Sequence, residues 1–368
     1  MQLSILLSTF KDIFIFLSVL GVLIMVHELG HFLVARRVGV RVERFSIGFG
    51  FRLFSRKKRD TEYVISAIPL GGYVKLAGDN LQEYKGAKDE YYSKTPGQRA
   101  QVIFAGPLFN YILGFLLFSF IFFLGYPNLT TKVGGLREGF GAQAAGIKPK
   151  DRILAIDGKP VKYWEQLQRI IQEKKEADEV LLLVERDKEK LFFKVRIRQD
   201  NLDDTIGGKR TVGLLGITPD GEFELVRYGF ISSFLQGANR TWFLTVMTYK
   251  AFWRMLSGRL SVQESVTGPL GVFYVTSKSA KLGLIPLLHL LAILSVSLAI
   301  FNLLPLPILD GGHILLLGLE KLRGKTISLK AERWINQVGI TIILSLALFV
   351  TFNDIARFFG DKIVKFLK

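Results

Sequence analysis

Four long apolar stretches constrain this chain more than any other feature of its sequence. They lie at about 13–35, 100–125, 282–309 and 334–352, and each is as long as the roughly 20 helical residues that cross a bilayer. Hydrophobic residues make up 49% of the 368 positions, more apolar surface than one soluble core of this size can bury. The sequence therefore predicts a polytopic α-helical membrane protein with four transmembrane helices.

Basic residues are spread unevenly, and their distribution predicts the orientation. Residues 36–100 carry 14 Lys and Arg against 7 Asp and Glu, and residues 317–333 carry 5 against 2. Such an excess in short loops beside apolar spans is typical of cytoplasmic loops. This orientation puts the segment 126–284 outside, and also the basic tail, which could lie on the membrane surface. It accounts for much of the net charge of +17 without nucleic acid, for which the sequence has no recognition motif.

The spans and the segments between them predict the domain organisation. In chain order we expect a first transmembrane helix at 1–40, a cytoplasmic-side β-hairpin or re-entrant loop at 41–98, a second transmembrane helix at 99–126, an extracytoplasmic α+β domain at 127–220, amphipathic membrane-surface helices at 221–281, a third transmembrane helix at 282–316, a cytoplasmic loop at 317–333, a fourth transmembrane helix at 334–356 and a tail at 357–368.

The hairpin is predicted from alternation. Apolar and polar side chains alternate on both sides of the polar run 55–60, which we expect to be a turn. Gly71 and Gly72 then form a loop before a further strand. The aromatic content of 41–76 indicates that this element touches or enters the membrane.

The segment 129–220 has the pattern of a separate soluble domain. Gly-rich turns separate short strands at 181–184 and 192–197 from a helical stretch at 164–171. The following stretch, 228–256, is amphipathic and rich in Phe, Trp and Leu, which favours one or two helices on the outer membrane surface. Packing on the soluble domain is the alternative.

The first apolar stretch contains His27-Glu28-x-x-His31. On a helix, a spacing of four puts both imidazoles on one face, about 5–6 Å apart, where they can share one metal ion. In metalloproteases with this pattern, the glutamate is the general base. Ionisable groups in a bilayer span are costly and point to a function, although neighbouring helices could also satisfy them. His27 precedes Arg36 by about 13 Å of helix rise, so the pair lies in the hydrocarbon, toward the cytoplasmic face.

A catalytic zinc ion takes three protein ligands and a water. The chain has no cysteine, so the third ligand must be His, Asp or Glu. Asp310 ends a stretch whose two prolines break the helix at a depth that matches His27 and His31, and broken helices at that depth line protein or water. His289 lies at the outer end of the same span and is more typical of a packed residue. His313 remains an alternative ligand.

These motifs together resemble the site-two protease family of intramembrane zinc metalloproteases, in its bacterial RseP (regulator of sigma-E protease) type. The resemblance covers nearly the whole chain. The motifs that carry it are His-Glu-Leu-Gly-His at 27–31, Asn-x-x-Pro-x-Pro-x-Leu-Asp-Gly-Gly-His at 302–313, Gly-Pro-x-x-Asn at 106–110, Ile-Pro-Leu-Gly-Gly-Tyr-Val at 68–74, Thr-Gly-Pro at 267–269 and Phe-Asn-Asp at 352–354.

The resemblance implies one zinc ion on His27, His31 and Asp310, with Glu28 as the catalytic base. It also implies that Asn302 contacts the substrate or helps to hold the cleft.

The resemblance further implies that the hairpin, with Gly71 and Gly72, clamps an unwound substrate by strand addition. This agrees with the physics of the problem, because a transmembrane helix must open its internal hydrogen bonds before hydrolysis, and a strand edge supplies new partners.

The soluble segment is similar to a PDZ domain over 146–161 and 212–217. Gly213, Leu214, Leu215 and Gly216 would form the peptide-binding loop, whose backbone N–H groups could hold a chain terminus. A groove closed by its own structure is the alternative. One such unit is present, which departs from the two-PDZ pattern of better-known relatives.

The sequence thus predicts an intramembrane zinc metalloendopeptidase of the bacterial cytoplasmic (inner) membrane, with a role in stress response. The resemblance suggests single-pass membrane substrates already cut outside, such as anti-sigma factors, and signal-peptide remnants. A non-catalytic PDZ-bearing adaptor is the alternative, but every residue that the chemistry requires is present. A metal-dependent transporter would need further carboxylates or histidines in the second and fourth spans, which lack them.

Overall fold

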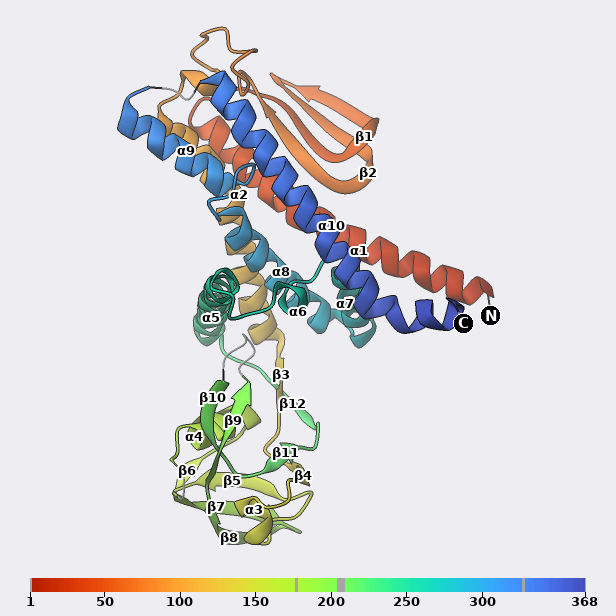
Figure 1. The fold of residues 1–368 in the computed structure, drawn as a ribbon, viewed down its shortest axis with the longest axis vertical. Helices are drawn as coiled ribbons and strands as arrows, with labels where there is room; N and C mark the ends of the chain where they lie inside the picture. Colours follow the sequence, from red (N-terminus) through yellow and green to blue (C-terminus); the bar gives the residue numbers. More distant parts are fainter. Residues whose placement is uncertain (1, 176–177, 204–208, 326–327, 368) are drawn as a thin grey trace. The chain divides into compact units, whose positions relative to one another are not determined.

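Apolar helices and one hairpin form the first of two units into which this computed structural model divides. The structure describes residues 2–175, 178–203, 209–325 and 328–367. The first unit consists of Met1–Ile121, Ser233–Tyr249 and Val262–Lys368, and the second of Phe122–Ser232 and Lys250–Ser261. The elements that fall wholly or mostly in the first unit (Figure 1) are α1 Gln2–Arg37, β1 Val42–Lys58, β2 Thr61–Leu76, the 3-10 turn Tyr91–Ser93, α2 Pro96–Leu124, α5 Phe230–Leu256, α6 Val262–Ser265, α7 Pro269–Leu282, α8 Leu284–Asn302, α9 Asp310–Arg323 and α10 Leu329–Leu367.

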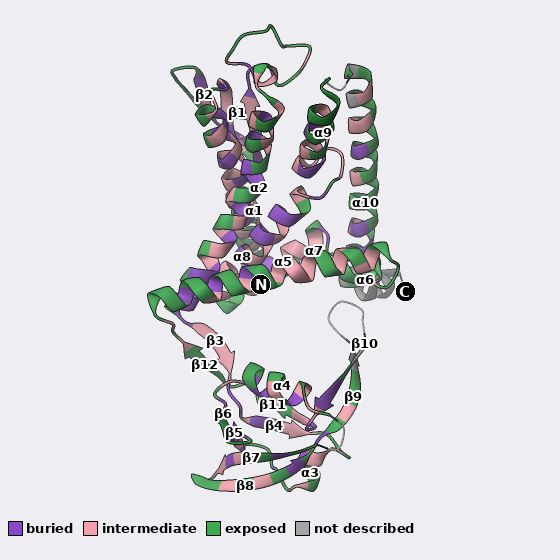
Figure 2. Ribbon diagram, turned by 90° about the vertical axis from the view of Figure 1, so that its left-hand side faces the viewer, coloured by how far each residue is buried: buried purple, intermediate pink, exposed green. Residues whose placement is uncertain are grey.

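Within the described residues, four helices are long and apolar enough to cross a membrane, as the sequence predicts. They contain the stretches Leu6–Arg37, Pro96–Leu124, Leu284–Asn302 and Arg333–Arg357. Much of α10 is exposed (Figure 2). Its exposed residues include large apolar ones, such as Leu344 at 57% and Leu348 at 72% exposure. Such exposure is costly in water and favourable in lipid.

The third span is shorter than expected. The helix α8 ends at Asn302 rather than near 309, and Asp310 begins a separate helix, α9. Pro305 and Pro307 lie between the two helices and have no N–H to continue a helical ladder, and Ile308 has a φ of 78°. The segment 317–333, predicted as the cytoplasmic loop between the third and fourth spans, is largely helical, because α9 continues to Arg323 and α10 begins at Leu329. The predicted tail is helical to Leu367.

The helix α7 packs inside the first unit. Ser277 of α7 donates a hydrogen bond to Asp12 of α1 (2.6 Å), and the rings of Phe16 and Phe273 meet edge to face. At its start, the carboxylate of Asp354 accepts hydrogen bonds from the N–H groups of Gly268 and Gly271, 3.2 and 2.8 Å away. The Thr-Gly-Pro and Phe-Asn-Asp motifs therefore meet here, where a carboxylate caps a helix N-terminus.

The strands β1 and β2 pair with each other over 42–76. Both strands bend. As a result, Phe45 in the first part of β1 pairs with Tyr63 near the start of β2 and also with Val74 near its end. Gly48 and Gly50 have φ values of 91° and 85°, which allow the bend in β1. The predicted turn at 55–60 is too long, because strand pairing continues to Lys58 opposite Thr61.

The second unit is an α+β domain. Its main sheet has the strand order β6-β5-β7-β8. Its elements are β3 Tyr126–Leu129, β4 Val133–Leu136, α3 Gly141–Ala144, β5 Arg152–Ile156, β6 Lys159–Pro160, α4 Trp164–Gln172, β7 Glu179–Arg186, β8 Glu189–Arg196, β9 Arg198–Asp203, β10 Lys209–Leu214, β11 Ile217–Pro219 and β12 Phe223–Val226.

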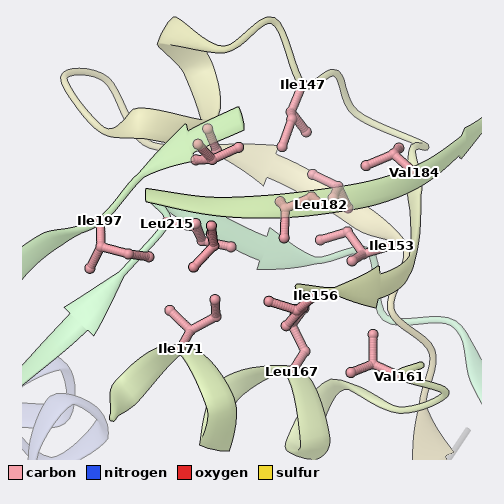
Figure 3. Packing of buried hydrophobic residues seen from close by; sticks show 14 of the residues in the cluster. Ile147, Ile153, Ile156, Val161, Leu167, Ile171, Leu182, Val184, Ile197 and Leu215 are labelled. Atoms are coloured by element: carbon pink, nitrogen blue, oxygen red, sulfur yellow. The ribbon is translucent and has the colours of Figure 1, made fainter. Parts of the chain in front are cut away.

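The core of this unit lies between α4 and the strands (Figure 3). Leu167 and Ile171 of α4 point toward Ile156, Leu182 and Leu215. The strand β12 pairs with β3, so the domain extends past the predicted boundary at 220. The prediction of helices from 221 onward is therefore wrong over 223–226, where the alternation of Phe-Glu-Leu-Val suits a strand. Over Phe230–Leu256 the structure has one helix.

We expect Gly30→Ala to destabilise the first unit. A Cβ at this position of α1 would lie 2.3 Å from the carbonyl oxygen of Ala105 in α2, so the two helices would have to separate. Overpacking of this kind costs about 1–3 kcal/mol. Thermal unfolding of the full chain in detergent measures the change. Gly318→Ala in α9 is the control, since a Cβ there meets nothing within 4 Å and should leave the melting temperature unchanged or raise it. Equal melting curves for the two variants would contradict this expectation.

Candidate metal centre

The histidines of the first helix face each other. Their Nε2 atoms lie 3.1 Å apart, and the rings meet edge to face at a centroid distance of 4.7 Å. This follows from the local sequence, because 27 and 31 are one helical turn apart in an uninterrupted apolar helix. His27 is buried and His31 is half-buried.

Asp310 meets this pair from the first residue of α9. Its Oδ2 lies 3.1 Å from Nε2 of His27, and its Oδ1 lies 3.7 Å from Nε2 of His31. One ligand atom from each of the three residues lies within 4.8 Å of the others, and among the described residues they form the group suited to one metal ion. The break at 303–309 makes this possible, because Gly311 and Gly312 let the start of α9 fold back against the carbonyls of Leu303 and Leu306.

The helix α2 orients both imidazoles. Nδ1 of His31 lies 2.8 Å from the carbonyl oxygen of Val102, and Nδ1 of His27 lies 3.5 Å from Nδ2 of the fully buried Asn110. Partners on Nδ1 leave Nε2 of each ring for an ion. Gly106 of the same helix lies against both imidazole rings, and a Cβ there would come within 2.4 Å of His31 Nε2. The sequence places the motif 106–110 in the second span but does not predict these contacts.

Glu28 lies beside the same cluster and next to a strand edge. The backbone N–H of Val74 in β2 hydrogen-bonds to its carboxylate. A Cβ on Gly72 would lie 3.7 Å from Cγ of Glu28, an ordinary contact, but only 2.6 Å from the carbonyl oxygen of Ser46, so a glycine there lets β1 and β2 pair closely beside Glu28. The neighbouring Gly71 has a φ of 148° and lies against the ring of Phe49.

A cavity of about 360 Å³ opens beside this cluster. Glu28, His31, Val74 and His313 line it, so the alternative ligand His313 is close to the cluster without belonging to the group of three. Asn302, the last residue of α8, is half-buried and is not among the lining residues that the structure describes.

His289 lies away from this cavity. Its ring packs edge to face on Phe118, 5.5 Å between centroids. This agrees with the expectation that it packs between helices.

An ion pair in the lining of the cavity joins α2 to α9. The guanidinium of Arg99 donates a hydrogen bond to the carboxylate of Glu320, and both side chains are largely buried, at 4% and 12% exposure. Arg99 also lies over the rings of Tyr91 and Tyr92. The helix that begins with Asp310 is thus held to the helix that orients the histidines. Nothing in the sequence pairs two residues so far apart.

In the second unit, a groove of about 290 Å³ runs between α4 and residues 213–218. It is lined by the predicted segment Gly213, Leu214, Leu215 and Gly216, which lies opposite Leu167 on α4. The groove is open, so its own side chains do not fill it.

Comparison with known proteins gives one consistent result. The family model described as Peptidase family M50 matches residues 15–346. The chain belongs to this family. A Campylobacter jejuni protein named as a zinc metalloprotease is 34% identical over 351 residues, which cover 93% of this chain and 93% of that protein. The regulator of sigma-E protease RseP of Escherichia coli is 29% identical over 449 residues, which cover 95% of this chain and 100% of that protein.

Membership in family M50, the site-2 protease family, makes this chain a zinc metalloprotease with several membrane-spanning helices. A solved PDZ domain of an SdrC-like protein from Listeria innocua is 22% identical and covers 24% of this chain and 92% of that one, with a TM-score of 0.20.

We expect Glu320→Gln to lower the affinity for zinc. Removing one charge of a buried pair leaves Arg99 uncompensated, and α9 loses its polar attachment to α2. Loss of such supporting contacts typically costs about 10- to 100-fold in metal affinity. Zinc binding to the purified full chain, in competition with a chelator, measures the effect. Lys321→Gln is the control, since Lys321 is the next residue of α9 and is exposed. Wild-type zinc affinity in Glu320→Gln would show that the pair does not position Asp310.

Proposed function

We propose that His27, His31 and Asp310 hold the zinc ion of an intramembrane metalloendopeptidase. The observation that carries the proposal is the convergence of two imidazole nitrogens and a carboxylate within 4.8 Å, beside Glu28 and a cavity. Two nitrogens and one oxygen are a donor set that zinc accepts at catalytic sites, with a position left for water or substrate. Ionisable side chains at membrane depth are costly, and binding a metal ion would offset that cost.

The chemistry is hydrolysis of a peptide bond. Bound zinc would act as a Lewis acid toward the attacking water and the substrate carbonyl. Glu28 accepts a proton from the attacking water and returns it to the leaving amine as the C–N bond breaks. Asn110 and the carbonyl of Val102 keep the two imidazoles oriented, as their contacts with Nδ1 support.

The substrates are single-pass membrane proteins. A transmembrane helix protects its peptide bonds with internal hydrogen bonds, so it must unwind before cleavage. The segment of β2 around Gly72 and Val74 has β1 on one side and Glu28 on the other. An unwound substrate would add to this edge, taking over the N–H of Val74 from Glu28, and so be held beside the catalytic base. The role of Asn302 in holding substrate stays a prediction, since it does not line the cavity.

The loops with an excess of basic residues support an active site that opens to the cytoplasm, with the second unit outside. The groove at 213–218 would then take substrate termini produced by a first cut outside. The name of the Escherichia coli relative supports anti-sigma factors as one substrate class. Signal-peptide remnants are the other class that we propose. The protein would lie in the bacterial inner membrane and act in a stress response.

We expect Glu28→Gln and Asp310→Ala to abolish cleavage for different reasons. Glu28→Gln keeps the three donors but removes the base, so zinc is retained while turnover falls by about 10²-fold or more. Asp310→Ala removes a donor, so both zinc and turnover are lost. The assay is cleavage of a model transmembrane substrate by the full chain in liposomes, with zinc content measured on the same samples. Full activity in both variants would refute the protease site, and retained biological function without catalysis would favour the adaptor.

We expect Val74→Pro to impair substrate binding with little effect on zinc. Proline is tolerated at a sheet edge where the N–H points outward, and the Val74 N–H points toward Glu28 rather than into the sheet. The substitution removes the donor that contacts Glu28 and that an added substrate strand would use, so kcat is measured beside KM to separate an effect on the base from one on binding. We predict a KM raised about tenfold for the membrane substrate and an unchanged zinc content. An unchanged KM would exclude strand addition at this edge.

A further inference from the structure

A second polar cavity, of about 440 Å³, lies where the end of α1 meets the turn between β1 and β2. It shares no lining residue with the cavity at Glu28. Four basic side chains line it, and they come from two regions of the sequence: Arg36 and Arg41 from the end of α1 and the residues just after it, and Lys58 and Arg59 from the hairpin turn.

The charges of this cavity are not balanced. Asp60 and Asp89 are the acidic residues in its lining, and Asp89 already pairs with Arg41 at 2.8 Å. Over the described parts of the chain, no carboxylate lies within ion-pair distance of Arg36, Lys58 or Arg59. The cavity therefore presents unneutralised cations and would favour an anion.

Its position is that of a lipid headgroup. Arg36 is the penultimate residue of the candidate span Leu6–Arg37, so it lies where that helix would leave the hydrocarbon. The hairpin exposes large apolar side chains near its bends, where Phe51 is 74% and Leu53 64% exposed. The hairpin thus has exposed apolar side chains that suit lipid tails. Its turn has basic side chains that suit the membrane–water interface.

We propose that this cavity binds the phosphate of an anionic phospholipid. Arginine guanidinium groups bind phosphate oxygens with two parallel hydrogen bonds, and a lysine beside them adds charge. A lipid held here contacts both the end of α1 and the hairpin turn. A free phosphate has the same chemistry but no tails, so the membrane position of the cavity favours the lipid. This site does not depend on the proposed protease chemistry.

The test is titration of the full-length, zinc-loaded protein in neutral detergent with soluble short-chain phosphatidylglycerol, followed by calorimetry. The cavity variant is Arg36→Gln with Lys58→Gln. The control variant is Arg56→Gln with Lys57→Gln, which also removes one arginine and one lysine, at positions of β1 that do not line the cavity. We expect the cavity variant to lose about tenfold or more in affinity and the control to stay within about twofold of wild type.

Two comparisons distinguish a lipid site from a free-phosphate site and from a general attraction of anions. Inorganic phosphate is titrated alone, and binding as tight as that of the lipid would overturn the lipid assignment. Equal losses in the cavity and control variants would also overturn the proposal, since they would show an attraction by overall charge.

Arg36→Lys tests recognition by the guanidinium. It keeps the charge but loses the bidentate geometry, so it should bind the lipid with intermediate affinity. Wild-type affinity in this variant would contradict such recognition. The substituted side chains are all exposed, and melting temperatures confirm that each variant is folded.

Discussion

Polar groups at membrane depth have no water to satisfy them, and this cost governs the architecture of the first unit. The two imidazoles and the Asp310 carboxylate face one another, and each imidazole has a second partner on α2. The unwound segment before α9 satisfies several of its own backbone groups, since the N–H of Leu306 donates to Leu304 and the N–H of Leu309 donates to Leu306. It is also packed against the start of α9, where Gly311 and Gly312 approach its carbonyls. Irregular backbone at this depth is tolerated because protein surrounds it or water reaches it through the adjoining cavity. The candidate metal centre and the helix break therefore depend on each other.

Close backbone approach allows the pieces to converge. Gly30 lies against the backbone of Ala105, and Gly106 faces the two imidazoles, so α1 and α2 approach closely at the candidate metal centre. Gly72 allows a similar approach within the hairpin, where a Cβ would lie 2.6 Å from the carbonyl oxygen of Ser46. Each of these glycines is required by what a Cβ would strike. Packing through small residues is how helices associate in lipid, where no hydrophobic force drives them together.

Much of the site could be predicted from the sequence because its signals are local. The spacing of His27 and His31 fixes their geometry on any helix, and the depth of Asp310 in its span matched theirs. The end of α8 at Asn302 was missed because hydropathy does not distinguish a continuous apolar helix from two helices joined by an apolar break. The contact of His31 with Val102 could not be predicted either, since it uses a backbone carbonyl, which any residue supplies. The ion pair of Arg99 with Glu320 could not be predicted, because only the tertiary fold brings the two residues together. The register of the hairpin could not be predicted either, because both strands bend and the pairing shifts along them.

The place of Glu28 has a consequence for specificity under the proposed function. The carboxylate touches the N–H of Val74, so the edge that would hold the substrate and the group that would move the proton are one hydrogen bond apart. A strand that pairs with this edge can shift only by whole residues, and each single shift turns the side chains to the opposite face. Register on β2 would then decide which peptide bond lies at the base. Sequence preference would arise from which side chains must face Glu28 and the cavity, and from how readily the substrate helix unwinds at that point, rather than from a deep pocket for one residue.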